Sequence, residues 1–337
     1  MLRKIALLLL IIVAGSATGL SWMAQQIEKY VSTPVVLESP ELVTVPEGAH
    51  FRSMLNVLQT KGLVAPSDWS RWAPKVYPEL ASFRAGTYLV KPDMTLRDVF
   101  DLFRVGKEHQ FSITFVEGSR FSEWREQLAK TGYLTHDSAA LSEAQIAEKI
   151  GVKKSKLEGL LLPETYHYVA GQSELSILKR AADEMNKALE KAWSERNTSV
   201  PLKTSYELLT LASIVEKETA VDGERPKVAS VFANRLNKRM RLQTDPTVIY
   251  GMGDKFQGNI TKKDLREKTP YNTYVINGLP PTPIAMPGAA AIMAAANPEK
   301  TPYFYFVANG TGGHTFSKTL SEHNRAVKKL IQIQRRK

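Results

Sequence analysis

The hydrophobic positions of this chain form one long apolar run near the N-terminus and shorter amphipathic segments after it. Residues 5–23 contain no charged side chain. About 20 apolar residues are enough for a helix to cross a bilayer, so this run predicts a single transmembrane helix, with Trp22 at the membrane interface. Arg3 and Lys4 precede the run. The positive-inside rule therefore places the short N-terminus in the cytoplasm and everything after Gln25 outside it.

A cleaved signal peptide is the alternative for this run, because a basic start followed by an apolar stretch is typical of both. We expect an uncleaved anchor over residues 1–25, since the run is long and no small-x-small site follows its apolar core. Residues 26–40 are rich in polar residues and proline. We expect them to form a tether between the anchor and the rest of the chain.

Beyond the tether, a strand-turn-helix pattern is repeated. Residues 42–62 show strand-like alternation before a Glu-Gly pair, then apolar residues at helical spacing and a closing glycine, and residues 112–132 repeat the pattern. Residues 86–103 form a third strand-then-helix unit. Alternation predicts a strand, a period of about 3.6 residues predicts a helix, and glycine marks a turn or a helix end. We therefore expect a repeated βα region over residues 41–155 and a second domain over residues 156–337.

The longest helical patterns lie in this second domain. Residues 175–196 predict an amphipathic helix. A helix that starts at Ser205 ends with the two carboxylates of Glu216 and Glu218. A further helix over residues 226–239 opens with proline, which is favoured in the first turn, and is expected to pack against it.

The apolar stripe of the helix from Ser205 places one glutamate against a hydrophobic face. At about 100° per residue, Glu218 falls within about a quarter turn of the stripe's centre, whereas Glu216 points away. A carboxyl group on apolar surface is partly desolvated, which raises its pKa and suits a general acid. An ordinary surface glutamate at a helix end is the alternative interpretation. The stripe consists of Leu208, Leu211, Ala212 and Val215.

Polar and aromatic clusters follow these helices. Residues 242–248 combine amide, hydroxyl and carboxylate groups with a proline, and residues 270–274 combine two tyrosines with an asparagine and a threonine. Such side chains suit a neutral polysaccharide, which offers hydroxyl groups for hydrogen bonds and apolar faces for aromatic rings. Each cluster by itself also fits a plain turn. The stiff, proline-rich residues 278–288 are expected to brace the wall of a groove.

Composition and charge narrow the classes of function. The chain has 337 residues, enough for two domains, and it has no cysteine, which excludes disulfides and thiolate metal sites. Its formal net charge of +11 suits a polyanion, an anionic lipid surface or an acidic polymer. Basic residues are scattered among acidic ones, and no nucleic-acid-binding motif is present. We therefore expect no nucleic acid as a partner.

Rival catalytic groups near the C-terminus form no recognised motif. His314, Glu322 and His323 could ligate zinc, but the HExxH pattern is missing. Ser317 follows His314, but no GxSxG elbow accompanies it. We therefore expect neither a metal nor a nucleophilic serine.

Five spaced motifs resemble those of the YceG-like endolytic murein transglycosylases, and residues 86–96 resemble a LysM module, which binds glycans that contain N-acetylglucosamine. The usual glycine of the LysM turn is missing here. The resemblance implies an α+β fold with a single N-terminal transmembrane helix, a small LysM-like βα domain and a mixed α+β catalytic domain. The motifs are Ser213–Glu218, Leu242–Thr247, Tyr271–Tyr274, Gly278–Ile284, and His314–Ser317 with Glu322–Asn324.

This resemblance implies a lyase that cleaves MurNAc–GlcNAc bonds in nascent peptidoglycan strands and leaves 1,6-anhydroMurNAc ends. Glu218 matches the second glutamate of the family's SIVEKE-type motif, which implies that it is the catalytic acid and base, without a metal or cofactor. The resemblance also implies a single-pass protein of the inner membrane with its catalytic region in the periplasm, associated with penicillin-binding synthases. The residues expected to contact substrate are Gln243, Thr244, Asp245, Tyr271, Asn272, Thr273, Glu164, His314, Ser317 and Asn324.

Two other functions remain open. A muramidase that hydrolyses the same bond would pair Glu218 with a second carboxylate, such as Asp245 or Glu164. A noncatalytic glycan-binding scaffold for wall synthesis enzymes would use Glu218 only as a structural residue.

Overall fold

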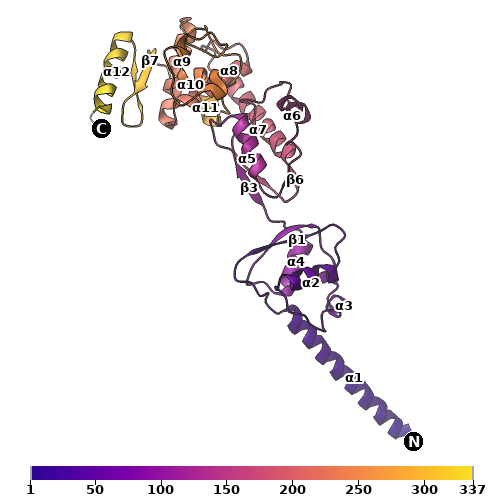
Figure 1. Ribbon diagram of the computed structural model, residues 1–337. Helices are drawn as coiled ribbons and strands as arrows, with labels where there is room; N and C mark the ends of the chain where they lie inside the picture. Colours follow the sequence, from indigo (N-terminus) through magenta and orange to yellow (C-terminus); the bar gives the residue numbers. More distant parts are fainter. Residues whose placement is uncertain (1, 336–337) are drawn as a thin grey trace. The chain divides into compact units, whose positions relative to one another are not determined.

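The computed structural model describes residues 2–335, which form two compact units. The first unit contains the chain up to Phe111 together with His167–Gly171, and the second contains Ser112–Tyr166 together with the chain from Gln172 onward. Figure 1 shows their elements along the chain. Helices and strands are mixed in each unit, in agreement with the expected α+β class.

The first unit joins a long helix to a small two-stranded sheet covered by helices. Strands β1 and β2 are antiparallel, with Val43 opposite Tyr88, and both side chains are fully buried. Apolar residues of α2 and α4 complete the core. The elements are α1 (Leu2–Val31), β1 (Glu41–Val45), α2 (Phe51–Thr60), α3 (Ala73–Val76), the 3-10 turn η1 (Pro78–Ala81), β2 (Gly86–Val90) and α4 (Leu96–Val105).

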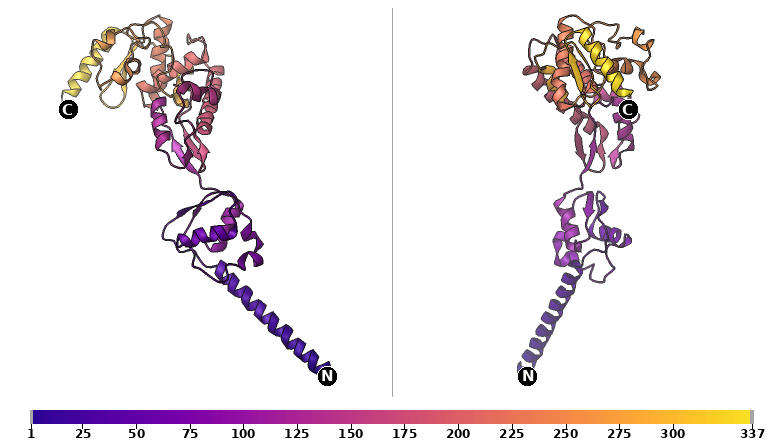
Figure 2. Two further views of the ribbon diagram at one scale, coloured as in Figure 1. Left: turned by 45° about the vertical axis from the view of Figure 1, so that its right-hand side comes forward. Right: turned by 90° about the vertical axis from the view of Figure 1, so that its left-hand side faces the viewer.

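Helix α1 is exposed over most of its length and buried near its C-terminal end. Its apolar side chains up to Trp22 are exposed, whereas Ile27 and Val31 near its end are fully buried in the core of the first unit. Within residues 2–335, α1 is the one helix long and apolar enough to cross a membrane. Figure 2 shows it as a continuous rod up to the body of the first unit.

The segment expected to be a tether is instead packed into the first unit. Residues 26–31 are the last turns of α1. Beyond them, the amides of Val35 and Val36 donate hydrogen bonds of 2.9 Å to the carbonyls of Met94 and Leu63. The apolar residues spaced among the polar ones are the physical reason, because they reach the core while their polar neighbours stay in water.

The three repeated strand-then-helix units are confirmed, but they are divided between the two units. The pairs β1–α2 and β2–α4 belong to the first unit, whereas β3 (Phe111–Thr114) and α5 (Phe121–Lys130) lead into the second. The ring of Phe115 stacks on Trp124 of α5 at 3.8 Å between centroids, and Tyr166 lies beside them. All three rings belong to the second unit, which begins at Ser112, well before the expected boundary at residue 155.

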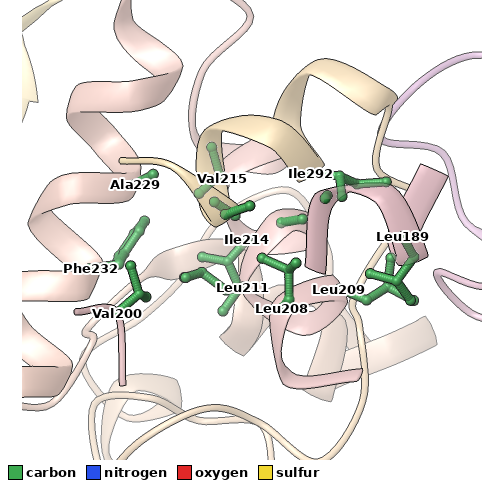
Figure 3. Close-up of a cluster of buried hydrophobic side chains, with 14 of the residues drawn as sticks. Leu189, Val200, Leu208, Leu209, Leu211, Ile214, Val215, Ala229, Phe232 and Ile292 are labelled. Carbon is green, nitrogen blue, oxygen red and sulfur yellow. The ribbon is translucent and has the colours of Figure 1, made fainter. Parts of the chain in front are cut away.

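The second unit is built around one buried helix, α8 (Ser205–Glu218), which packs against α7 (Glu174–Ser194), α9 (Arg225–Asn237) and α11 (Ala289–Ala296). Figure 3 shows the cluster of leucine, isoleucine, valine and phenylalanine side chains between these helices. The expected packing of the second helix on the first is confirmed. The sequence predicted that only one apolar stripe of α8 would be buried. In the structure every residue from Leu208 to Val215 is buried, so α8 is covered on all sides.

Short elements complete the second unit. Strand β7 pairs with β8 in an antiparallel hairpin, and α12 packs against both strands. The remaining elements are β4 (Leu134–Thr135), α6 (Glu143–Lys149), β6 (Gln172–Ser173), η2 (Asp222–Glu224), α10 (Asp245–Met252), η3 (Gly253–Lys255), η4 (Asp264–Arg266), β7 (Tyr305–Ala308), β8 (His314–Ser317) and α12 (Leu320–Gln334). Strand β5 (Thr165–Tyr168) is divided, because its last two residues belong to the first unit.

The proline-rich residues 278–288 form an irregular segment that is hydrogen-bonded to α8. The amide of Ile284 donates to the hydroxyl of Ser213 at 3.0 Å, and the amide of Gly288 donates to the Glu216 carboxylate at 3.0 Å. Gly159 has φ +78°, and a Cβ there would lie 2.3 Å from the Cβ of Pro283. The close approach of the two backbones therefore requires glycine.

A buried carboxyl group lies beside this segment. The side chain of Glu158 is 7% exposed, and its Oε1 accepts a hydrogen bond of 3.2 Å from the amide of Phe121. Burial raises the pKa of Glu158 to about 7, although hydrogen bonds from Phe121 and Tyr250 oppose the shift. The folded protein therefore holds a proton here that the unfolded chain releases at lower pH.

We predict that Glu158 makes the protein less stable as pH rises from about 4.5 to about 7. The unfolded state ionises first, so the free energy of unfolding falls by about 1.4 kcal/mol per pH unit in this window, roughly 3 kcal/mol in total. Urea unfolding of Glu158→Gln across the window should lack this slope. The exposed Glu148→Gln serves as the control, and equal pH slopes in the two variants would contradict the prediction.

Candidate active site

Glu218 is the last residue of α8, so its position is fixed by a helix in which every residue from Leu208 to Val215 is buried. Burial raises the pKa of Glu218, and the Asp245 carboxylate raises it further. A hydrogen bond from Thr244 and the positive groups of His314 and Arg235 oppose the shift without cancelling it. The carbonyl end of a helix also disfavours a negative charge. The site therefore favours the protonated carboxylic acid more than water does.

A network of threonines holds the partner of Glu218. The Thr244 hydroxyl donates to Glu218 Oε1. The amide of Thr244 donates to Thr273 Oγ1 at 3.0 Å, and the Thr247 hydroxyl donates to the carbonyl of Thr244 at 2.7 Å. All three threonines are at most 2% exposed. Because their hydrogen bonds join the loop before α10 to residues 272–273, these two segments together orient the Glu218 carboxyl group.

Asp245 lies next to this pair but remains exposed, as the first residue of α10. It accepts a hydrogen bond of 2.6 Å from the Tyr274 hydroxyl. Gln243 precedes them with φ +49°, a left-handed conformation that turns the chain sharply before Thr244. The loop thus presents an amide, a hydroxyl and a carboxylate in sequence.

The hairpin of β7 and β8 contributes a histidine that is paired with a carboxylate. His314 Nδ1 lies 2.7 Å from Glu224 Oε2, and the backbone amide of His314 donates to Glu224 Oε1 at 2.9 Å. Burial alone would raise the pKa of Glu224, but the two contacts with His314 lower it below its ordinary value. A carboxylate only accepts hydrogen bonds, so Nδ1 carries the proton in this pair.

A cavity of about 450 Å³ brings these groups together. Its size falls in the range of ligand sites. The cation of Arg235, 8% exposed, forms part of its wall and donates to the carbonyls of Phe304 and Leu242, both at 2.7 Å. The lining residues are Glu218, Phe232, Arg235, Leu242, Gln243, Thr244, Asp245, Tyr274, Tyr305, Phe306, Val307, Ala308, His314, Leu320 and His323.

Glu216 has a different environment, although it is only two residues away. Its carboxylate accepts from the amide of Gly288 and lies 3.7 Å from the guanidinium of Arg225. Burial raises its pKa as well, as the largest effect. A raised pKa therefore does not distinguish the two glutamates, but the cavity does, since only Glu218 lines it.

The expected substrate-contacting residues fall into two groups. Gln243, Thr244, Asp245 and His314 line the cavity together with Glu218. The others lie outside its lining. Asn272 and Thr273 are fully buried and hold backbone and threonine groups in place, and Tyr271 bonds to Thr282 at 2.9 Å. Ser317 is buried in β8, and Glu164 and Asn324 are exposed.

Several residues that form or support the cavity were not identified from the sequence. Tyr274 lies in the motif Tyr271–Tyr274, so the sequence could have indicated it as a cavity residue. Arg235, and Glu224, which lies outside the lining and binds His314, carry no local signal, because their contacts join residues far apart in the chain. His323, considered from the sequence only as a possible zinc ligand, lines the cavity. Its ring stacks on Tyr305 with 5.3 Å between ring centroids, and burial lowers the pKa of its imidazole.

Comparison with known proteins gives consistent matches. The model of the YceG-like family matches residues 43–329. The endolytic murein transglycosylase of Bacillus subtilis (strain 168) is 32% identical over 321 residues, which cover 88% of this chain and 86% of the relative. That of Streptococcus pneumoniae serotype 2 (strain D39 / NCTC 7466) is 30% identical, covering 87% of this chain and 59% of the longer relative.

A solved structure agrees with these matches. The crystal structure of a putative YceG-like protein from Listeria monocytogenes has a TM-score of 0.53 and 30% sequence identity to this chain. The alignment covers 86% of this chain and 99% of the Listeria chain. The family match spans most of the chain, including Glu218 and the other residues that line its cavity. The chain therefore belongs to the YceG-like family.

Proposed function

We propose that this protein is an endolytic transglycosylase that cleaves MurNAc–GlcNAc bonds in peptidoglycan strands and leaves 1,6-anhydroMurNAc ends. The relatives named endolytic murein transglycosylases support the reaction and its substrate. The observation that carries the proposal is a half-buried glutamate, Glu218, whose pKa is raised by desolvation and which lines a cavity of ligand size. No cofactor enters the proposed reaction.

In the first step, the protonated Glu218 acts as general acid. It donates its proton to the glycosidic oxygen as the bond to the anomeric carbon of MurNAc breaks, and the GlcNAc hydroxyl leaves. The raised pKa favours the protonated form of Glu218 that this step requires. The Thr244 hydroxyl donates to Glu218 Oε1, so it stabilises the carboxylate that this step produces.

In the second step, the Glu218 carboxylate acts as general base. It removes the proton from the C6 hydroxyl of the same MurNAc, whose oxygen attacks the anomeric carbon and closes the 1,6-anhydro ring. The proton returns to Glu218, and the cycle is complete. Because the nucleophile belongs to the substrate, its effective concentration is high and no second carboxylate has to activate water.

The remaining polar groups suit the binding of sugar rings. Gln243 and Asp245 offer hydrogen-bonding groups on one side of the cavity, and His314, oriented by Glu224, offers its ring from the β7–β8 hairpin. Tyr305 and Phe306 supply aromatic surface for a pyranose face. Arg235 and His314 lower the pKa of Glu218 and thus limit its rise.

We further propose that α1 anchors the protein in the inner membrane, with the second unit in the periplasm. The apolar, exposed surface of α1 up to Trp22 supports the anchoring, and Arg3 and Lys4 support the orientation. Association with penicillin-binding synthases and glycan binding by the LysM-like segment stay predictions.

The muramidase is the second candidate, because Asp245 lines the same cavity as Glu218. A two-carboxylate mechanism would use Asp245 as base or nucleophile. Its hydrogen bond from the Tyr274 hydroxyl would orient its carboxylate. Glu164, the other sequence candidate, does not line the cavity.

We predict that Glu218→Gln abolishes cleavage, with a loss of at least about a hundredfold in rate, because the amide can neither donate nor accept the transferred proton. Asp245→Asn should still produce anhydro ends. Mass spectrometry of the products from uncrosslinked glycan strands measures both. Hydrated reducing ends from the unmodified protein, lost in Asp245→Asn, would favour the muramidase, and a fully active Glu218→Gln variant would exclude the proposed acid.

We predict that Thr244→Val shifts the pH profile of the reaction. The acid must be protonated, so kcat/KM falls as pH rises through the pKa of Glu218. Removing the Thr244 hydroxyl removes a bond that stabilises the carboxylate. The basic limb of kcat/KM should therefore move to higher pH by about one unit. Thr198→Val, at an exposed site, is the matched control, and an unmoved limb would count against the assigned acid.

A further inference from the structure

The depth of α1 in a bilayer can be read from its sequence. Arg3 and Lys4 mark the cytoplasmic end of the apolar run. A helix rises about 1.5 Å per residue, and about 20 residues cross a hydrocarbon core of about 30 Å. A helix that enters the core near Ile5 therefore leaves it near Ala24. Trp22, which is 56% exposed, then lies at the outer interface.

A second tryptophan of the first unit is held at the same level. The rings of Trp22 and Trp69 meet edge to face, with centroids 5.5 Å apart. Further along α1, the Glu28 carboxylate accepts hydrogen bonds from Tyr77 and, at 2.7 Å, from Arg97. These contacts clamp the segment 69–77 to α1. Its depth is thus fixed by the helix and does not depend on a flexible linker.

The segment 69–77 has the composition of an interfacial segment. It contains three aromatic residues and two cations, and it has no acidic residue. The cations of Arg71 and Lys75 lie over the ring of Trp72, at 5.4 Å and 4.4 Å from its centroid. Tryptophan and tyrosine favour the headgroup level of a membrane, and cations favour its anionic lipids. Figure 1 shows α3, which is part of this segment, beside the end of α1 that enters the first unit.

A cavity of about 820 Å³ opens beside this segment. Arg52 and Arg71 contribute two cations to its lining, and Ser67 and Ser70 contribute hydroxyl groups. Asp68 is the only acidic residue among those that line it. Within residues 2–335, neither Arg52 nor Arg71 takes part in an ion pair. The two cations outnumber the one carboxylate, so the lining of the cavity has a net positive charge.

We propose that this cavity binds the phosphate headgroup of an anionic phospholipid from the membrane that α1 crosses. The two arginines would pair with the phosphate, the serine hydroxyls would donate to its oxygens, and Trp22 and Trp69 would lie at the acyl boundary. The site rests on the proposed anchoring by α1. It would fix the rotation and height of the first unit on the membrane surface.

The test uses the full chain in detergent and in vesicles. Flotation with phosphatidylcholine vesicles first establishes anchoring. Native mass spectrometry then compares how well the chain retains phosphatidylglycerol and phosphatidylcholine, in the unmodified protein, in Arg52→Gln/Arg71→Gln, and in the control Lys91→Gln/Lys107→Gln. The control removes the same charge from exposed positions of the first unit. Cleavage of soluble glycan strands checks that both variants are folded.

We expect the preference for phosphatidylglycerol to fall by about fivefold for each arginine removed, and to stay unchanged in the control. An anchored chain in which both double variants lose the preference equally would overturn the headgroup site and leave the anchoring intact. A chain that does not float with vesicles would overturn both. Equal preference for the two lipids in the unmodified protein, or displacement of phosphatidylglycerol by soluble glycan strands, would also overturn the headgroup site.

Discussion

The burial of α8 is the constraint on which the second unit depends. Eight consecutive residues, from Leu208 to Val215, lie in the core, and α7, α9 and α11 surround them. A helix held on all sides cannot rotate or slide without opening cavities, and each lost core contact costs about 1 kcal/mol or more. Its last residue, Glu218, therefore has a fixed backbone position at the wall of the cavity. The same burial that stabilises the fold desolvates this carboxyl group.

The loop that faces Glu218 is constrained by polar contacts and not by apolar packing. Thr244, Thr247 and Thr273 satisfy one another and the local backbone inside the protein. Buried hydroxyl groups are costly unless they are bonded, so this network has one stable arrangement. The motifs Leu242–Thr247 and Tyr271–Tyr274, about thirty residues apart in the chain, are thus held together by hydrogen bonds. Thr247 and Thr273 thus have a structural role in orienting Thr244, and they need not contact the sugar themselves.

The sequence predicted the parts of this arrangement that have a local signature. Periodicity located α8, α9 and the three strand-helix pairs, and the motifs drew attention to Glu218 and Thr244. It failed where the answer depends on long-range contacts. Arg235 meets Phe304, and Glu224 meets His314, across large sequence separations. The tether was mispredicted for a related reason. Ile27, Val31 and Val35 are too few to form a clear period, but each reaches the core.

The packing of residues 26–40 into the first unit fixes how that unit is joined to α1. If residues 26–40 were a flexible tether, the height of the first unit above a membrane would vary with the linker. Because α1 instead continues into the core, and Glu28 binds Tyr77 and Arg97, the first unit inherits the orientation of the helix. All residues that line the Glu218 cavity belong to the second unit. Substitutions in α1 and the rest of the first unit therefore leave the residues that line the cavity unchanged.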